Sequence, residues 1–216
     1  MTSPQVSIME SPGISIHRVL LTLMLAVMAM LVSAFQLAEG DLLFACSDTA
    51  NAITAVTSGI DELPIDHVGV VHRIGGPTGP LFVIEAIKPQ VCINSLDTFL
   101  CNNGEVIVGR LNEEFDAKES VRRCLNMVGK PYDDLYLPGD SAVYCSELVQ
   151  MNYVTTAGER IFGTIPMSFH DQSGQITQYW IDFYRTRGMN VPEGWPGTNP
   201  GELSRRPQVT ILGPVR

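Results

Sequence analysis

The stretch Asp66-His67-Val68-Gly69-Val70-Val71 predicts a buried β-strand, because valines dominate it and a histidine stands inside the apolar run. A Gly- and Pro-rich turn over residues 75–80 and a second apolar stretch, Leu81–Ile87, follow it. This order is typical of an antiparallel hairpin with a longer loop. Glu85 is a single charge in the second strand, and a carboxylate is costly to bury unless it is paired. We therefore expect Glu85 to face the imidazole of His67; a solvent-facing glutamate on a half-buried strand is the alternative.

A cysteine opens the segment Tyr144-Cys145-Ser146-Glu147-Leu148-Val149, which lies in a helix predicted from about Val143 to Thr156, with Gly158 at its end. A thiol in the first turn of a helix faces unpaired N–H groups and the positive end of the dipole, which both stabilise a thiolate. His67 on a neighbouring strand would take and return the proton in nucleophilic catalysis by Cys145. The backbone N–H of Cys145 is then one oxyanion donor, and the sequence identifies no second donor. A buried structural thiol or half of a disulfide is the alternative.

Two other histidines are weaker candidates for the base. His72 has the opposite strand parity to His67 and is expected to be exposed on the other face. His170 lies in a segment without regular pattern and is the reserve base. Asp41 and the Tyr132-Asp133-Asp134 segment are interpreted as turn residues that could line the cleft.

Further strands are predicted within Gly40–Phe44, Glu105–Leu111 and Val209–Leu212. Asp116 and Glu119 have the spacing of a capping box and predict the start of another helix. The Pro- and Gly-rich tail before the last strand is expected to be irregular. The sequence thus predicts an α+β fold, a mainly antiparallel sheet packed against helices.

The N-terminus carries an apolar run, Val19–Ser33, which follows His17 and Arg18 and ends in small residues. At about 15 residues the run suits a secretory signal better than a spanning helix, which needs roughly 20. We therefore predict a signal peptide over residues 1–34, a single domain over residues 35–216, and a secreted or periplasmic location. No stable membrane span would remain after cleavage near Ala34. An uncleaved N-terminal membrane anchor is the alternative.

The chain is acidic, with a formal net charge of −9. Residues 1–34 hold one acid, Glu10, and one base, Arg18, so their removal does not change this value. The remaining residues are enough for one domain with a substantial core. The negative charge argues against nucleic acid as a partner and against electrostatic docking to anionic membranes.

The odd number of cysteines leaves one thiol unpaired in an oxidising compartment, unless the chain dimerises through it. Cys145 is the candidate for that free thiol. The other four form bridges or are buried as small apolar side chains: Cys46, Cys92, Cys101 and Cys124. Neither the cysteine spacing nor the scattered histidines predict a metal site, and no cofactor is expected.

Five short motifs occur in one order along the chain: Gly40-Asp41-Leu42-Leu43-Phe44, His67-Val68-Gly69-Val70-Val71, Val83-Ile84-Glu85-Ala86, Gly129-Lys130-Pro131-Tyr132-Asp133 and Tyr144-Cys145-Ser146-Glu147-Leu148-Val149. Together they resemble the circularly permuted papain-like hydrolases of the NlpC superfamily, in particular its YiiX-like branch. The ending over residues 191–200 is also similar to members of that branch. The resemblance covers nearly all of residues 40–212.

This resemblance implies a papain-like fold in permuted order, in which the histidine strand precedes the cysteine helix. It assigns Cys145 as nucleophile, His67 as base and Glu85 as the third, polar member. Family members are thought to cleave amide bonds in cell-wall peptides or N-acyl compounds, and the lecithin retinol acyltransferase relatives move acyl groups of lipids.

We therefore expect an exported cysteine hydrolase that cleaves a peptide or N-acyl amide bond through an acyl-thioester on Cys145. Its partner would be a cell-wall peptide, an N-acyl compound or a lipid-like small substrate, with the oligomeric state left open. A lipid acyl hydrolase or acyltransferase is one alternative, and a catalytically silent binding module of the same fold is the other.

Overall fold

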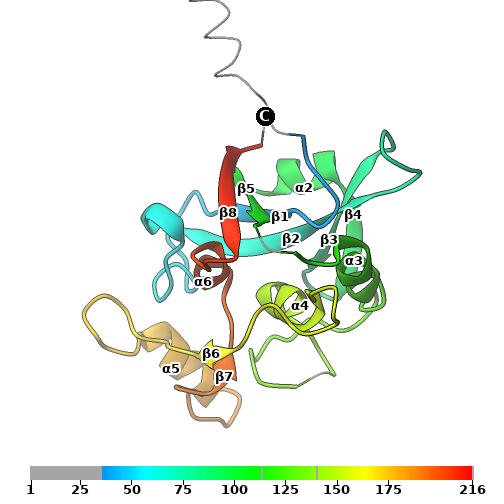
Figure 1. Cartoon of the computed structure of the whole chain (residues 1–216). Coiled ribbons are helices and arrows are strands. Elements are labelled where there is room, and N and C mark those ends of the chain that lie inside the picture. The colour runs from blue at the N-terminus through cyan, green and yellow to red at the C-terminus, as the bar shows by residue number, and fades with distance from the viewer. Residues whose placement is uncertain (1–35, 113, 140, 216) are drawn as a thin grey trace, which may run out of the picture. The chain divides into compact units, whose positions relative to one another are not determined.

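The computed structural model describes residues 36–112, 114–139 and 141–215 (Figure 1). The predicted signal peptide lies outside these residues. Leu37–Arg216 forms one compact unit. None of the helices in the described ranges has both the length and the apolar character needed to cross a membrane.

Six strands form the main sheet, in the order β4-β3-β2-β1-β5-β8, and all neighbours are antiparallel. Their bounds are β1 (Leu42–Cys46), β2 (Ile65–Arg73), β3 (Leu81–Ala86), β4 (Val91–Ser95), β5 (Val106–Leu111) and β8 (Val209–Pro214). The predicted hairpin is confirmed, since β2 pairs with β3 and places Val71 opposite Val83. A separate two-stranded ladder joins β6 (Ile165–Pro166) to β7 (Pro196–Gly197).

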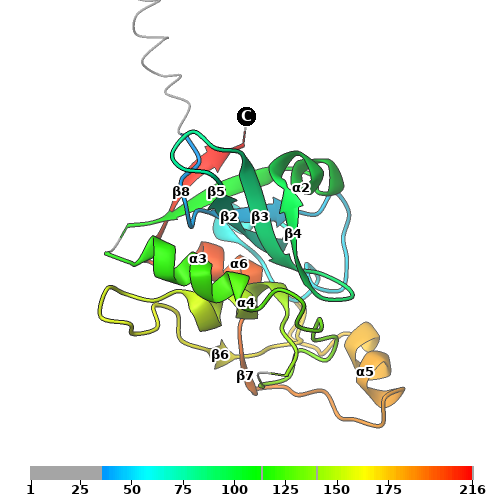
Figure 2. The ribbon, with the colours of Figure 1, turned by 90° about the vertical axis from the view of Figure 1, so that its right-hand side faces the viewer.

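The helices are α2 (Leu96–Asn102), α3 (Ala117–Leu125), α4 (Cys145–Asn152), α5 (Gln178–Arg185) and α6 (Pro200–Ser204), with a short 3-10 turn, η1 (Ile60–Glu62). Helix α2 lies on one side of the sheet, while α3, α4 and α6 lie on the other (Figures 1 and 2). The predicted α+β class with an antiparallel sheet is confirmed.

Helix α4 is shorter than predicted and ends at Asn152 rather than near Thr156. Tyr153 leaves helical geometry with φ −79° and ψ 120°. Its fully buried ring stacks on Phe115, and its hydroxyl donates to the carbonyl of Gly40 at 2.8 Å. Tertiary packing of this tyrosine, rather than the glycine at position 158, therefore ends the helix.

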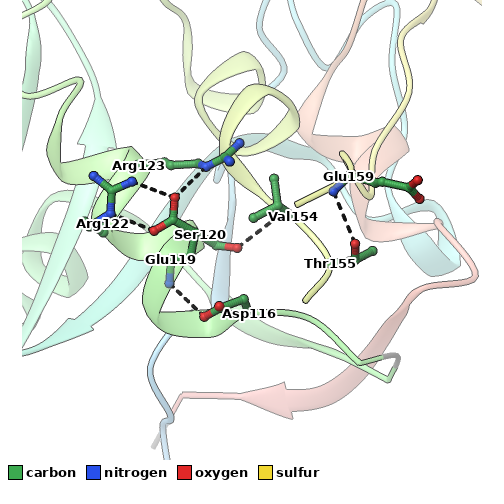
Figure 3. Close-up of polar contacts among 8 residues, drawn as sticks. All are labelled: Asp116, Glu119, Ser120, Arg122, Arg123, Val154, Thr155 and Glu159. Carbon is green, nitrogen blue, oxygen red and sulfur yellow. Dashed lines mark hydrogen bonds and ion pairs between the residues drawn. The ribbon is translucent and has the colours of Figure 1, made fainter. Parts of the chain in front are cut away.

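The N-terminus of α3 is capped as its sequence predicts, but only by half of the capping box (Figure 3). The Asp116 carboxylate accepts from the backbone N–H of Glu119 at 2.9 Å. The Glu119 carboxylate binds Arg122 and Arg123 instead of reaching back. The N–H of Asp116 donates to the carbonyl of Val154 at 3.0 Å, so the start of α3 is tied to the segment that follows α4.

The Pro- and Gly-rich tail is not wholly irregular as predicted, because it contains α6; helix α5 lies before the tail and was not predicted. Helix α6 starts with Pro200 as its first residue, and the Asn199 side chain accepts from the N–H of Glu202 at 2.7 Å. Both features are standard at a helix start. Helix α5 is held by a small aromatic core in which Trp180 and Tyr184 are buried. The high Pro and Gly content of the tail concealed α6.

Gly69 of β2 gives a test of the packing over this part of the sheet. A Cβ added there would lie 2.4 Å from Val83 Cγ1 and 3.0 Å from Phe99 Cε2, so neighbouring side chains must shift. We expect Gly69→Ala to lower the free energy of unfolding by about 1–3 kcal/mol, the usual range for overpacking. Urea denaturation measures this. Gly163→Ala is the control, because its added Cβ meets nothing within 4 Å; equal stability of the two variants would contradict the prediction.

Candidate active site

Three neighbouring strands contribute a chain of polar side chains. His67 Nε2 on β2 lies 2.7 Å from Glu85 Oε2 on β3, and Glu85 Oε1 accepts from Asn94 Nδ2 on β4 at 2.8 Å. Glu85 is only 3% exposed, yet both of its oxygens are bound. The structure thus places Glu85 against the imidazole, where the sequence expects it.

Asn94 is a site residue that the sequence analysis missed. Glu85 lies opposite Cys92 in the β3–β4 ladder, so Asn94 is its diagonal neighbour on the same face of the sheet. The assignment of β4 as a strand was the missing step, since only that pairing brings an asparagine to the carboxylate.

The imidazole of His67 is also held by Phe99 of α2. The two rings are stacked, with centroids 5.9 Å apart and an interplanar angle of 30°. Phe99 is fully buried, so its ring forms a fixed wall. The orientation of the imidazole is therefore set by one carboxylate and one aromatic face.

Cys145 is the first residue of α4 and follows Tyr144, whose backbone is extended. Its thiol lies close to His67 and is one of the groups that raise the pKa of the imidazole. Because Nε2 is directed at Glu85, Nδ1 is the ring nitrogen left for the thiol. All five cysteines are unbridged, so the sulfur of Cys145 is not held in a cystine.

The ionisation of His67 reflects this environment. Burial of the ring opposes the charged form, but hydrogen bonds to Cys145 and Glu85 outweigh burial and raise the pKa of His67 from 6.5 to about 10. The ring is therefore an imidazolium at neutral pH. An imidazolium beside a sulfur favours the thiolate, the reactive form of cysteine.

Glu147 is buried in the first turn of α4, and its Oε2 has no hydrogen-bond partner among the described residues. Burial, and then the charge of Asp133, raise the pKa of Glu147 to about 8. At neutral pH this carboxyl is therefore mostly uncharged, and no carboxylate in the first turn of α4 opposes a thiolate at Cys145.

A pocket opens beside Cys145 and is lined mainly by apolar and aromatic side chains, among them Tyr136, Tyr144 and Trp180. The Tyr144 hydroxyl accepts from the backbone N–H of Thr198 at 3.0 Å, which fixes the segment after β7 against the nucleophile helix. The aromatic residues at positions 136 and 180 come from segments that the sequence analysis did not connect to the site. A composition pattern alone does not show that these segments converge.

The remaining candidate histidines have other surroundings. His72 is half-buried rather than exposed, and its Nδ1 lies 2.9 Å from Glu39 Oε1, so the prediction of an exposed side chain is wrong. His170 Nδ1 lies 3.2 Å from Glu193 Oε1 and lines a polar groove that does not include Cys145. The structure thus brings neither histidine to the thiol.

The candidate cleft acids serve mainly in the scaffold. Buried Asp41 binds Arg110, with the Nε and Nη2 contacts at 2.8 and 2.7 Å. The Asp133 carboxylate accepts from the N–H groups of Leu135 and Leu137, as expected of a turn residue. Tyr132, in contrast, lies near Cys145, and burial followed by the charge of that cysteine raises the pKa of its phenol.

The comparisons with known proteins give the family and the fold. A family model described as "Permuted papain-like amidase enzyme, YaeF/YiiX, C92 family" matches residues 36–213. The crystal structure of metalloprotein yiiX from Escherichia coli O157:H7 is similar with a TM-score of 0.67 and 22% identity, over 82% of this chain and 97% of that chain. A search of curated proteins found no match. The predicted resemblance to the YiiX-like branch and the permuted papain-like fold are confirmed.

The contact between Glu85 and His67 predicts a measurable ionisation. Glu85→Gln keeps the shape but removes the charge, so the pKa of His67 should fall by about one to three pH units. Since the folded pKa is above the unfolded value of 6.5, the stabilisation is full below pH 6.5 and is lost as the pH rises to about 10. NMR of the ring nitrogens measures the pKa. Glu193→Gln is the control, and an unchanged pKa in Glu85→Gln would contradict the prediction.

The raised pKa of the Glu147 carboxyl predicts how the stability of the protein depends on pH. Its folded pKa of about 8 exceeds its usual value of 4.5, so the unfolded state releases this proton first and stability falls between those pH values. Glu147→Gln removes this titrating group. The Tm of the variant minus that of the unmodified protein should therefore increase as the pH rises from 4.5 to 8. Thermal unfolding across this pH range measures the difference. A constant difference in Tm would show that Glu147 is ionised in the folded state.

Proposed function

Because the chain belongs to the permuted papain-like amidase family YaeF/YiiX, C92, we propose that it is an exported cysteine amidase with Cys145 as nucleophile, His67 as proton shuttle and Glu85 as the group that orients His67. The family is one of hydrolytic enzymes of papain-like type, which supports cysteine hydrolase chemistry. The observation that carries the residue roles is the imidazole of His67, bound by Glu85 on one nitrogen and left with Nδ1 for the Cys145 thiol.

In the proposed reaction the Cys145 thiolate attacks the carbonyl carbon of an amide, and the oxygen takes up the negative charge. The backbone N–H of Cys145, in the unpaired first turn of α4, stabilises that oxyanion. His67 then gives its Nδ1 proton to the leaving amine as the C–N bond breaks. An acyl-thioester on Cys145 remains.

Water releases the acyl group in the second half of the cycle. His67, now neutral, takes a proton from the attacking water, and the C–S bond breaks as the carboxylic acid leaves. The proton on His67 restores the starting thiolate–imidazolium pair. Throughout the cycle Glu85 keeps Nε2 occupied, so that Nδ1 is the nitrogen that exchanges protons.

A metal-dependent reaction is not part of this proposal. The similar solved structure is described as a metalloprotein, and that description belongs to that protein. Within the described ranges, no group of three or more His, Cys, Asp or Glu side chains could hold a metal ion. The donors present there do not fit one, so no step passes through a metal.

The location and partners are part of the same proposal. The apolar run over residues 19–33 supports export to the cell exterior or periplasm, with an N-terminal anchor as the alternative. A cell-wall peptide or an N-acyl compound would supply the amide bond. The apolar pocket beside Cys145 favours transfer of a short acyl group as the second candidate function.

Replacement of the nucleophile tests the proposal. Cys145→Ser should lower kcat/KM for an acyl p-nitroanilide by roughly 10⁴-fold or more, because a serine hydroxyl does not form an ion pair with the imidazolium as the thiolate does. Cys101→Ser is the matched control, since Cys101 is exposed and lies outside the pocket. Turnover retained in Cys145→Ser, or lost equally in both variants, would contradict the assignment. Mass spectrometry of the intact protein identifies the adduct left after incubation with cell-wall fragments or a lipid extract.

A further inference from the structure

We infer that the pocket beside Cys145 holds a short, uncharged, apolar acyl group; this inference rests on the proposed role of Cys145 as nucleophile. The pocket walls come from several segments far apart in the chain, and the apolar side chains among them include Ile53, Val56, Tyr136, Met167, Phe169 and Trp180. A group bound between these side chains and the sulfur is the part of the substrate that stays on the enzyme after the leaving group departs.

The size of the pocket limits the length of that group. Its volume is about 40 Å³, whereas a neighbouring polar groove has about 500 Å³. A single buried water needs roughly 10–15 Å³ by the same measure, so the pocket has room for about three or four such volumes. A chain of a few carbons fits between these walls, whereas the rest of a long fatty chain would lie outside them.

The walls are fixed rather than adaptable. Trp180 Nε1 donates to the carbonyl of Ala52 at 3.1 Å, which ties α5 to the segment on the other side of the pocket. The Trp180 ring meets Phe169 and Tyr136 edge to face, with centroids 5.2 and 5.7 Å apart. Because several aromatic contacts must change together before the pocket widens, the length limit is built into the structure.

The apolar walls of the pocket exclude an anionic acyl group. A carboxylate on the substrate would lose its hydration among these side chains, and none of the described lining residues is a cation that would compensate for that loss.

Two residues of the lining carry buried hydroxyls that have no hydrogen-bond partner in the described part of the chain. Ser146 Oγ and Thr198 Oγ1 are buried, and neither has a hydrogen-bond partner among the residues that the structure describes. A pure hydrocarbon would leave both unsatisfied, which is unfavourable in a dry pocket. An acyl group carries an acceptor, its carbonyl oxygen, at the end that is bonded to the sulfur.

The polar groove next to the pocket indicates where the rest of the substrate lies. The pocket and the polar groove share Val56, Thr57, Ser168 and Asn199 in their linings, so the two adjoin. The substrate class is therefore an amide or ester of a short aliphatic acid whose polar remainder extends toward the groove.

A series of p-nitrophenyl esters tests this inference on the full chain: acetate, butyrate, hexanoate, dodecanoate and the singly charged succinate. We expect kcat/KM to be highest for butyrate or hexanoate and at least tenfold lower for dodecanoate and for succinate. Intact-mass spectra should show the acyl group on the protein and lose it in Cys145→Ser. Thr198→Val, which keeps the shape without the hydroxyl, should lower kcat/KM about tenfold for every ester.

Substitutions at Val56 should change the acyl chain length at which kcat/KM is highest. Val56→Phe fills the pocket and should shift the preference to acetate, whereas Val56→Ala widens it and should favour longer chains. Val128→Phe and Val128→Ala are the matched controls, because Val128 is exposed and lies outside the pocket, and the profile should not change. Alkylation of Cys145 by iodoacetamide shows that each variant retains a folded, accessible nucleophile.

The outcomes separate the inference from the proposed function. An acyl adduct on Cys145 with a flat chain-length profile, or with a rate that rises up to dodecanoate, rejects the short-acyl pocket and leaves the nucleophile in place. The same profile in the Val56 and Val128 variants also rejects the pocket. No adduct and no turnover across the series rejects both.

Discussion

Burial of the Glu85 carboxylate is the constraint on which the site depends. A carboxylate that is almost inaccessible to water must be paired and hydrogen-bonded, or it would be neutral or the structure would open. The partners of Glu85 come from the strands on either side, His67 on β2 and Asn94 on β4. A slip of one residue in either ladder would turn one partner to the other face. The orientation of the imidazole therefore depends on the pairing register of all three strands.

The second requirement is the position of the nucleophile helix, and the C-terminal part of the chain supplies much of it. Thr198 donates its N–H to the Tyr144 hydroxyl, next to the start of α4. At Gly197 a Cβ would lie 2.5 Å from Met167 Cγ and 3.1 Å from the same hydroxyl, so the backbone can approach this closely only without a side chain. The Pro- and Gly-rich tail is thus a packed wall of the site.

Local patterns in the sequence predicted the elements whose features lie within a few residues. The β2–β3 hairpin, the Asp116 cap and the helix start at Cys145 belong to this group, because turn residues, capping residues and apolar runs act over short distances. Strand β4 and helices α2, α5 and α6 were missed. Their short apolar runs form regular structure only through contacts with segments that are remote in the chain, which a local pattern does not show. Asn94 and Phe99 were missed with them. The prediction that His72 is exposed was wrong for the same reason. Strand parity indicated the face of the sheet, but Glu39, which pairs with His72, comes from outside the strand.

The charge pattern of the site links folding to reactivity. His67 and Cys145 are far apart in the sequence, and they meet because α4 packs Leu148 and Val149 into the same core as Val68 and Val70 of β2. Once they meet, the imidazolium lies between the Glu85 carboxylate and the thiol, and both contacts raise its pKa above that of a free histidine. Glu147, the acid in the first turn of α4, is instead pushed toward its neutral form by burial. One buried acid thus stabilises the positive charge on the ring, while the other does not add a negative charge beside the sulfur. Because the opposite behaviour of two glutamates follows from their partners alone, the same packing that completes the core also sets the ionisation that nucleophilic attack by the sulfur requires.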